Sequence, residues 1–164
     1  MARSSKSINN QPFLGWMGLA SLLLILDQLT KIIAKNNLFE NVSQPVTSFL
    51  NWTLVYNSGA AFSFLAQAGG WQRWFFTGLG IIAALVMIWL IRKNASQRIF
   101  SLALSLLLSG AIGNVIDRIL YGAVVDFIDV HYMGWHWPAF NIADSAITIG
   151  VILLIFDEIK RVNK

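Results

Sequence analysis

Four long apolar segments dominate this chain of 164 residues, at about residues 13–35, 74–91, 99–120 and 139–156. A helix that crosses the hydrocarbon core of a bilayer needs about 20 mostly apolar residues. Only 12% of the residues are charged, whereas a soluble domain carries roughly a quarter. The sequence therefore excludes a soluble or disordered protein. It predicts a membrane all-α fold with four transmembrane helices, organised as a single domain over residues 1–164.

The basic residues are distributed unevenly between the connections. Most of them precede the first segment, separate the second from the third, or follow the fourth: Arg3, Lys6, Arg92, Lys93, Arg98, Lys160, Arg161 and Lys164. The connections 36–70 and 121–138 themselves contain no Lys or Arg; Lys35 and Arg73 flank the first of them. Because Lys and Arg are retained on the cytoplasmic side, both termini are expected in the cytoplasm and these two connections outside. The net charge of +4 then needs no nucleic-acid partner.

The outer connections carry signals of their own. Val46–Tyr56 is rich in β-branched and aromatic residues and predicts one or two short strands, followed by a turn at Asn57-Ser58-Gly59. Ala60–Gln67 predicts an amphipathic helix lying on the membrane. The connection 121–138 is interpreted as a short aromatic loop with Asp129 at its periphery. An aromatic belt at the outer boundary is predicted from Trp71, Trp74, Tyr132, Trp135 and Trp137.

Polar residues interrupt three of the apolar segments, always near their outer ends. They are Asp27 and Lys31 in the first, Asn114, Asp117 and Arg118 in the third, and Asn141 and Asp144 in the fourth. A charge at the bilayer centre costs at least about 2.5–3.5 kcal/mol, so such residues are functional candidates by default. Spacings of three and four residues put each set on one helix face, which must turn away from lipid. The sequence predicts one polar cavity at the outer membrane surface.

The residue types available limit the chemistry of that cavity. The chain has no cysteine, no HExxH motif and no GxSxG motif, so neither a metal nor another cofactor is expected. Two carboxyl groups that share a site cannot easily both ionise, and such a pair can activate water against an amide. Asp126, just after the third segment, and Asp144, near the start of the fourth, are the natural pair. A Ser-Lys dyad that uses Lys31 stays an open alternative.

Two other classes of function compete with a hydrolase. A small proton-coupled membrane transporter would use Asp and Arg as a relay, but it would need polar residues through the full depth of the membrane. A non-enzymatic membrane subunit would use the same residues as assembly contacts.

Five ordered blocks of sequence resemble the lipoprotein signal peptidase (signal peptidase II) family, aspartic peptidases of bacterial cytoplasmic membranes. The blocks are Asp27–Lys31, Asn57–Phe62, Gly110–Arg118, Val124–Phe127 and Phe140–Asp144. The resemblance covers nearly the whole chain. It implies an outer part formed by a small β-cradle, with a mobile amphipathic helix that closes over the site.

The resemblance also implies the reaction and the residues that perform it. Asp126 and Asp144 would be the catalytic dyad, and the substrate a prolipoprotein cleaved before its diacylglyceryl-modified cysteine. Asn114 and Asn141 are expected to hold the dyad and the substrate backbone; Asn57, Arg118, Asp27 and Lys31 are expected to contact substrate or support the site. Besides the substrate, membrane lipid is the expected partner of a monomer in the bacterial inner membrane, with its active site at the periplasmic face.

Overall fold

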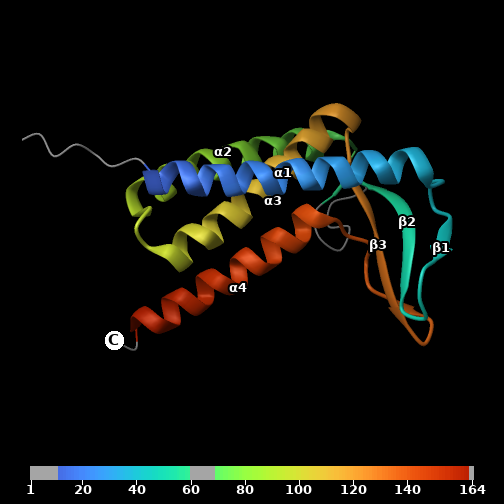
Figure 1. Ribbon diagram of the computed structural model, residues 1–164. Coiled ribbons are helices and arrows are strands. Elements are labelled where there is room, and N and C mark those ends of the chain that lie inside the picture. The colour runs from blue at the N-terminus through green and yellow to red at the C-terminus, as the bar shows by residue number, and fades with distance from the viewer. Residues whose placement is uncertain (1–10, 60–68, 163–164) are drawn as a thin grey trace, which may run out of the picture.

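Four helices and a four-stranded sheet make up the computed structural model, which describes residues 11–59 and 69–162 (Figure 1). The helices are α1 (Gln11–Asn37), α2 (Trp71–Asn94), α3 (Arg98–Tyr121) and α4 (Ile142–Val162). The strands are β1 (Ser43–Pro45), β2 (Leu50–Asn57), β3 (Val124–Tyr132) and β4 (Trp135–His136). The amphipathic helix expected at Ala60–Gln67 lies outside the described residues.

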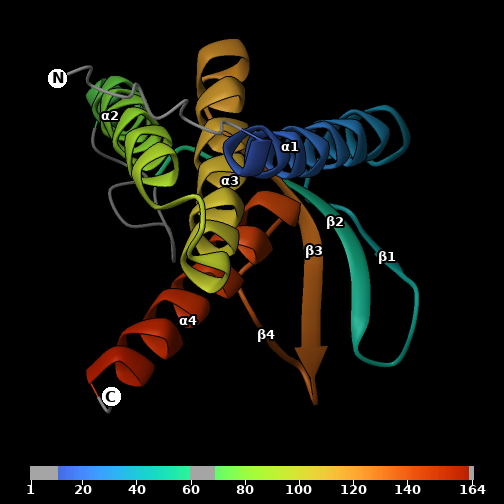
Figure 2. The ribbon, with the colours of Figure 1, turned by 60° about the vertical axis from the view of Figure 1, so that its left-hand side comes forward.

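Helix α3 is the centre of the bundle, with α1, α2 and α4 packed around it (Figure 2). Glycines allow α4 to approach it closely. A Cβ atom added at Gly110 would collide with the carbonyl oxygen of Ala143, and one added at Gly150 would lie 2.8 Å from Cγ of Leu107. Small residues at a crossing point are typical of helices that pack inside a membrane, because dispersion contacts there depend on close backbone approach.

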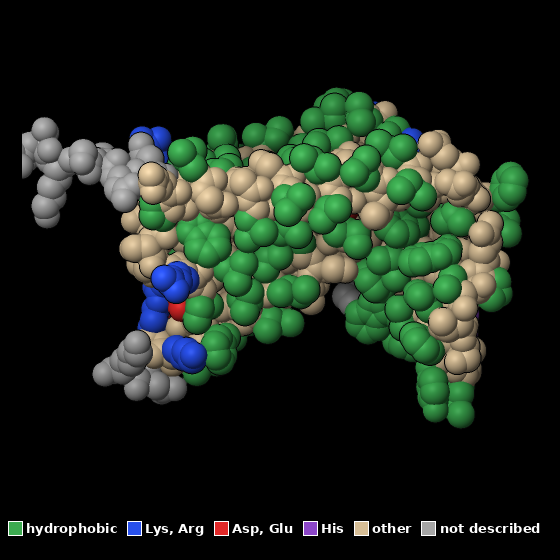
Figure 3. Space-filling model, viewed as in Figure 1, with side chains coloured by type: hydrophobic (Ala, Val, Ile, Leu, Met, Phe, Trp, Pro, Cys, Tyr) green, Lys and Arg blue, Asp and Glu red, His purple; other side chains and the backbone are tan. Residues whose placement is uncertain are grey.

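The bundle buries charged and polar side chains beside an apolar core cluster, and it exposes apolar side chains on its outer surface. Helix α1 buries Asp27 and Lys31 while it exposes Leu22, Ile25 and Ile33. Hydrophobic side chains cover the helices over most of the face shown in Figure 3. Since lipid offers no hydrogen-bond partners, this distribution is the one expected of a membrane-embedded protein.

Three of the four helices are long and apolar enough to cross a membrane, namely α1, α2 and α3. Helix α4 has 21 residues but carries charges at both ends: Asp144 near its start, and Asp157, Glu158, Lys160 and Arg161 near its end. It begins at Ile142 and ends at Val162. The helix thus starts and ends a few residues later than the apolar segment at about 139–156 predicted from hydropathy.

The sheet lies at one end of the bundle, with strand order β1-β2-β3-β4 and antiparallel pairing throughout (Figure 1). Strand β2 overlaps the region predicted to form strands, Val46–Tyr56, and extends one residue beyond it, to Asn57. The interpretation of 121–138 as a loop was wrong, because β3 occupies nine residues of it. In β2, one extra residue between Trp52 and Val55 forms an irregularity that brings Val55 opposite Asp126.

The five aromatic residues expected to form a belt are all exposed, with 45% to 68% of each side chain accessible. Exposure is what contact with an interface requires. The belt itself stays a prediction.

Candidate active site

Lys31 is the centre of a buried charge cluster between α1 and α3. Its Nζ lies 2.9 Å from Oδ2 of Asp27 and 2.7 Å from Oδ2 of Asp117, and it donates a 3.1 Å hydrogen bond to Oδ1 of Asn114. Lys31 is only 2% exposed. A buried ammonium needs partners of this kind, because its desolvation otherwise costs several kcal/mol. The predicted contact between Asp27 and Lys31 is present.

The two carboxylates of this cluster connect it to the neighbouring elements. Oδ1 of Asp27 accepts a 2.8 Å hydrogen bond from the backbone N–H of Ala143 in the first turn of α4. Oδ2 of Asp117 accepts one of 3.2 Å from the backbone N–H of Val125 in β3. The Gln28 side chain donates to both carboxylates, at 3.1 Å each. The cluster therefore fixes α4 and β3, which carry the two candidate catalytic residues, relative to α1 and α3.

Two asparagines connect the cluster to the aspartates. Asn114 donates from Nδ2 to Oδ1 of Asp144 at 2.9 Å, and Asn141 donates from Nδ2 to Oδ1 of Asp126 at 2.7 Å. The two asparagines also contact each other, with 3.4 Å between Nδ2 of Asn141 and Oδ1 of Asn114. A continuous chain of contacts thus runs from Lys31 to both aspartates.

Asn141 and Asp144 also form the N-terminal cap of α4. The backbone N–H of Asp144 donates to Oδ1 of Asn141 at 2.9 Å, and the backbone N–H of Asn141 donates to Oδ2 of Asp144 at 3.3 Å. This reciprocal pattern satisfies two helix donors that would otherwise lack partners. The cap holds the Asp144 carboxyl at the start of α4, on the side of Asp126.

Asp126 is 2% exposed and lies outside the helices, on β3. Burial, together with the negative charge of Asp144, raises the pKa of Asp126 from 3.8 to about 8, against the opposing effect of hydrogen bonds from Asn57 and Asn141. Two carboxyl groups that influence each other in this way share one proton near neutral pH. This arrangement can supply an acid and a base at the same time.

Arg118 and Asn57 lie at the edge of this group. The guanidinium of Arg118 donates to the carbonyl oxygen of Gly59 at 2.8 Å and lies 5.2 Å from the ring centroid of Phe76. Oδ1 of Asn57 accepts a 3.0 Å hydrogen bond from the Gly59 N–H, which is the expected turn chemistry. Arg118 therefore holds the backbone that follows β2, and Asn57 both forms the turn and reaches Asp126.

Asp129 is separate from the site. It accepts hydrogen bonds from the side chains of Asn51 at 2.9 Å and Thr53 at 3.3 Å, and its Oδ1 lies 2.8 Å from Nδ1 of His136. Burial would raise the pKa of Asp129, but these partners outweigh it and lower the pKa. The expectation that Asp129 lies in a loop was wrong, since it is a buried residue of β3 that joins three strands.

Sequence reasoning also missed Gln28 and the extent of the Asp117 contacts. Gln28 carries no charge and gave no signal beyond its place beside Asp27.

Within residues 11–59 and 69–162, no group of three or more His, Asp or Glu side chains is arranged to hold a metal ion.

Comparisons with known proteins all point to one family. The family model described as signal peptidase (SPase) II matches residues 19–160. A lipoprotein signal peptidase of Ralstonia nicotianae is 55% identical over 163 residues, covering 99% of this chain and 94% of that protein. One from Janthinobacterium sp. is 59% identical over 156 residues, covering 95% and 94%.

Solved structures resemble the fold as well. A bacterial membrane enzyme determined at 2.3 Å by the in meso method superposes with a TM-score of 0.80 at 39% identity, covering 89% of this chain and 88% of the other. A second, determined at 1.9 Å, gives a TM-score of 0.77 at 40% identity, with coverages of 89% and 93%.

Proposed function

Because this chain belongs to the signal peptidase II family, we propose that it removes signal peptides from prolipoproteins, using Asp126 and Asp144 to activate water. The observation that carries the proposal is the pair of asparagines that bridges the two carboxyl groups. Asn141 contacts both aspartates, and Asn114 is anchored to the buried Lys31. Such support is what a carboxyl pair needs to keep one geometry through a reaction.

The two aspartates are assigned different roles. Asp126 holds the shared proton at neutral pH, because its carboxyl is buried and its pKa is raised to about 8. Asp144, the other carboxyl of the pair, is assigned as the base; Asn114 and the backbone N–H of Asn141 donate to its two oxygens and hold it in place.

The reaction then proceeds in two balanced steps. Asp144 takes a proton from water as the water oxygen bonds to the scissile carbonyl carbon, and Asp126 gives its proton to the carbonyl oxygen. In the second step the C–N bond breaks, the proton on Asp144 passes to the leaving amine, and a hydroxyl proton of the intermediate returns to Asp126. Both residues end in their starting states.

The substrate cleavage site and the membrane arrangement complete the proposal. Cleavage is placed before a diacylglyceryl-modified cysteine, whose acyl chains lie between helices in the bilayer and so position the amide with binding energy remote from it. Helix α4 is the fourth span, because its apolar stretch lies between the charges at its two ends. Both termini are cytoplasmic, the site lies at the periplasmic face of the bacterial inner membrane, and the active form is a monomer.

A cleavage assay with purified enzyme tests this function. The substrate is a diacylglyceryl-modified prolipoprotein, the control substrate is the same protein without the lipid, and mass spectrometry identifies the new N-terminus. We expect cleavage before the modified cysteine only. Asp126→Asn and Asp144→Asn should each lower kcat by at least about 10³-fold.

The matched control is Glu158→Gln, an acid-to-amide change at the exposed far end of α4, which should cleave normally. Either active-site variant working at a near-normal rate would exclude the pair. Equal cleavage of the substrate without lipid would instead exclude the substrate class and leave the aspartates in place.

A further inference from the structure

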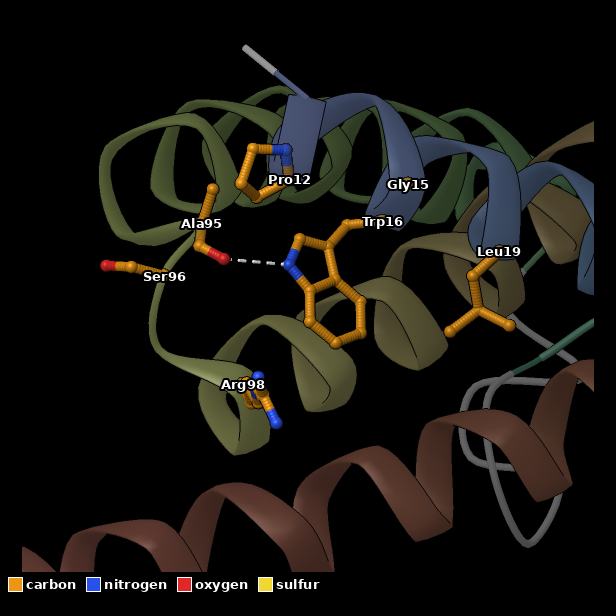
Figure 4. A pocket seen from close by; sticks show the side chains of 7 residues that line it. All are labelled: Pro12, Gly15, Trp16, Leu19, Ala95, Ser96 and Arg98. Carbon is orange, nitrogen blue, oxygen red and sulfur yellow. Dashed lines mark hydrogen bonds between the residues drawn. The ribbon is translucent and has the colours of Figure 1, made fainter. Parts of the chain in front are cut away.

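A cavity region lies at the end of α1 that is remote from the aspartates. A cavity of about 620 Å³ lies between the first turns of α1 and the connection from α2 to α3. Its α1 wall consists of Pro12, Gly15, Trp16 and Leu19, which share one helix face. Figure 4 shows Trp16 and Leu19 on one side, with the Trp16 indole bonded at 2.9 Å to the carbonyl oxygen of Ala95.

A basic cluster adjoins this cavity. Arg98 lines it and also lines a neighbouring cavity of about 480 Å³, together with Lys160 and Arg161 of α4. In that neighbouring cavity, three cationic side chains accompany one carboxylate, that of Asp157, which is paired with Arg161 at 2.7 Å. On the face shown in Figure 3, Lys and Arg side chains gather at this end of the molecule. Among the described residues, the Arg98 side chain has no carboxylate within ion-pair distance.

The start of α3 adds to the positive potential here. Arg98 is its first residue, its first turn contains no acidic residue, and the residue before it, Gln97, makes no side-chain hydrogen bond to cap the helix. The exposed N–H groups at the start of a helix carry partial positive charge and attract anions. At the start of α3 the positive charge of Arg98 adds to theirs, and no acidic residue of the first turn balances it. An anion bound at Arg98 would neutralise both the guanidinium group and the positive end of the α3 dipole.

We propose that this region binds one anionic phospholipid of the membrane leaflet opposite the active site. The phosphate would lie at Arg98 and the start of α3, with Lys160 nearby, and one acyl chain would lie along Trp16 and Leu19. The lining residues of α1 span about 10 Å along the helix axis, from the bundle end toward the bilayer centre. A lipid matches this combination, because charge lies at the membrane surface and the apolar wall lies deeper.

Native mass spectrometry of the detergent-purified full chain tests the proposal. The probes are phosphatidylglycerol and phosphatidylcholine with identical acyl chains, each at the same concentration. We expect one phosphatidylglycerol to be retained and phosphatidylcholine to be retained at least about fivefold less. Arg98→Gln should reduce phosphatidylglycerol retention to the level of phosphatidylcholine, whereas Lys93→Gln, an exposed cation at the same end that lines neither cavity, should not.

A glycine pair tests the apolar part of the site. A Cβ atom at either Gly15 or Gly18 meets nothing within 4 Å, but only Gly15 lines the cavity. Gly15→Leu should therefore fill the cavity and reduce retention at least about fivefold, while Gly18→Leu on the same helix leaves it unchanged.

Each opposite result overturns the proposal. Equal retention of the two lipids, or equal loss in Arg98→Gln and Lys93→Gln, would mean diffuse attraction to a positive surface. Equal effects of the two glycine substitutions would exclude the cavity. If excess inorganic phosphate fully displaces the lipid, the site binds a free anion and no lipid. The thermal unfolding temperature of each variant, measured in parallel, confirms that it is folded.

Discussion

Asn141 donates its side-chain amide to Oδ1 of Asp126 across 2.7 Å, a shorter bond than the 2.9 Å one from Asn114 to Asp144. Asn141 also caps α4 through its side-chain oxygen. One side chain therefore combines a structural role with a role in the site, and the two can be separated by substitution.

Asn141→Ser should separate them. Serine is also a favourable N-cap, so the start of α4 stays capped, but its short hydroxyl cannot replace the bonds that Asn141 makes to Asp126 and to the Val125 carbonyl. We expect kcat to fall about 10²-fold because Asp126 loses its fixed position. Asn141→Ala should lose the same activity and, in addition, about 1 kcal/mol of stability. Thermal unfolding and steady-state cleavage measure the two effects; an Asn141→Ser variant with native kcat would contradict the assignment.

The raised pKa of Asp126 has a consequence for catalysis. The proposed reaction requires Asp126 to be protonated, and its pKa is about 8. Since kcat/KM reports ionisations of the free enzyme, kcat/KM should fall about tenfold for each pH unit above about 8. A pH profile of cleavage that stays flat up to about pH 10 would exclude Asp126 as the acid.

The raised pKa of Asp126 also makes the stability of the folded chain depend on pH, with stability falling as the pH rises. The ordinary pKa of 3.8 and the folded value of about 8 mean that the folded chain binds the extra proton between these limits. The contribution to stability is therefore fully present below about pH 4 and is lost as the pH rises through about 8. Asp126→Asn cannot titrate, so its unfolding temperature should fall less than that of the native protein between about pH 5 and pH 9. An equal fall in both proteins would contradict the shift.

Hydropathy and helical spacing predicted much of this arrangement. The approximate positions of the apolar helices follow from the length of the apolar segments, and the contact of Asp27 with Lys31 follows from their spacing. The contact of Lys31 with Asp117 could not be predicted in the same way, because it depends on how α1 is rotated against α3. That rotation is a property of packing.

Strand β3 was missed for a different physical reason. Most of its residues are buried, including Val124, Val125 and Phe127, so the alternation of polar and apolar residues that marks a half-exposed strand is absent. Asp126 and Asp129 are three residues apart and so lie on opposite faces of the strand. This places Asp126 toward Asn141 and Asp129 toward Asn51, a distinction that needs the strand to be known first.

The Lys31 cluster should be required for folding stability. Lys31→Met removes the cation and leaves the carboxylates of Asp27 and Asp117 buried and close together, which should cost about 3–5 kcal/mol. The matched control is Lys35→Met, one turn later on α1, where Nζ lies 3.2 Å from the ring centroid of Tyr121 and the cost should be at most about 1 kcal/mol. Thermal unfolding in detergent measures both. Similar losses of stability in the two variants would mean that the buried ion pairs of Lys31 contribute no more to folding than the contact of Lys35 does.

The close approach of α3 to α1 leads to a prediction for Gly113. A Cβ atom there would lie 2.5 Å from Oδ2 of Asp27, an oxygen that pairs with Lys31. Gly113→Ala should therefore displace the carboxylate, cost about 1–3 kcal/mol of stability and lower kcat, because Asp27 also holds the first turn of α4 through Ala143. In Gly78→Ala on α2 the new Cβ meets nothing within 4 Å, so this control should gain up to about 1 kcal/mol from better helix propensity. Unfolding temperatures and cleavage rates of the two variants check the prediction, and a Gly113→Ala protein as stable and active as Gly78→Ala would show that α1 and α3 can separate without cost at this point.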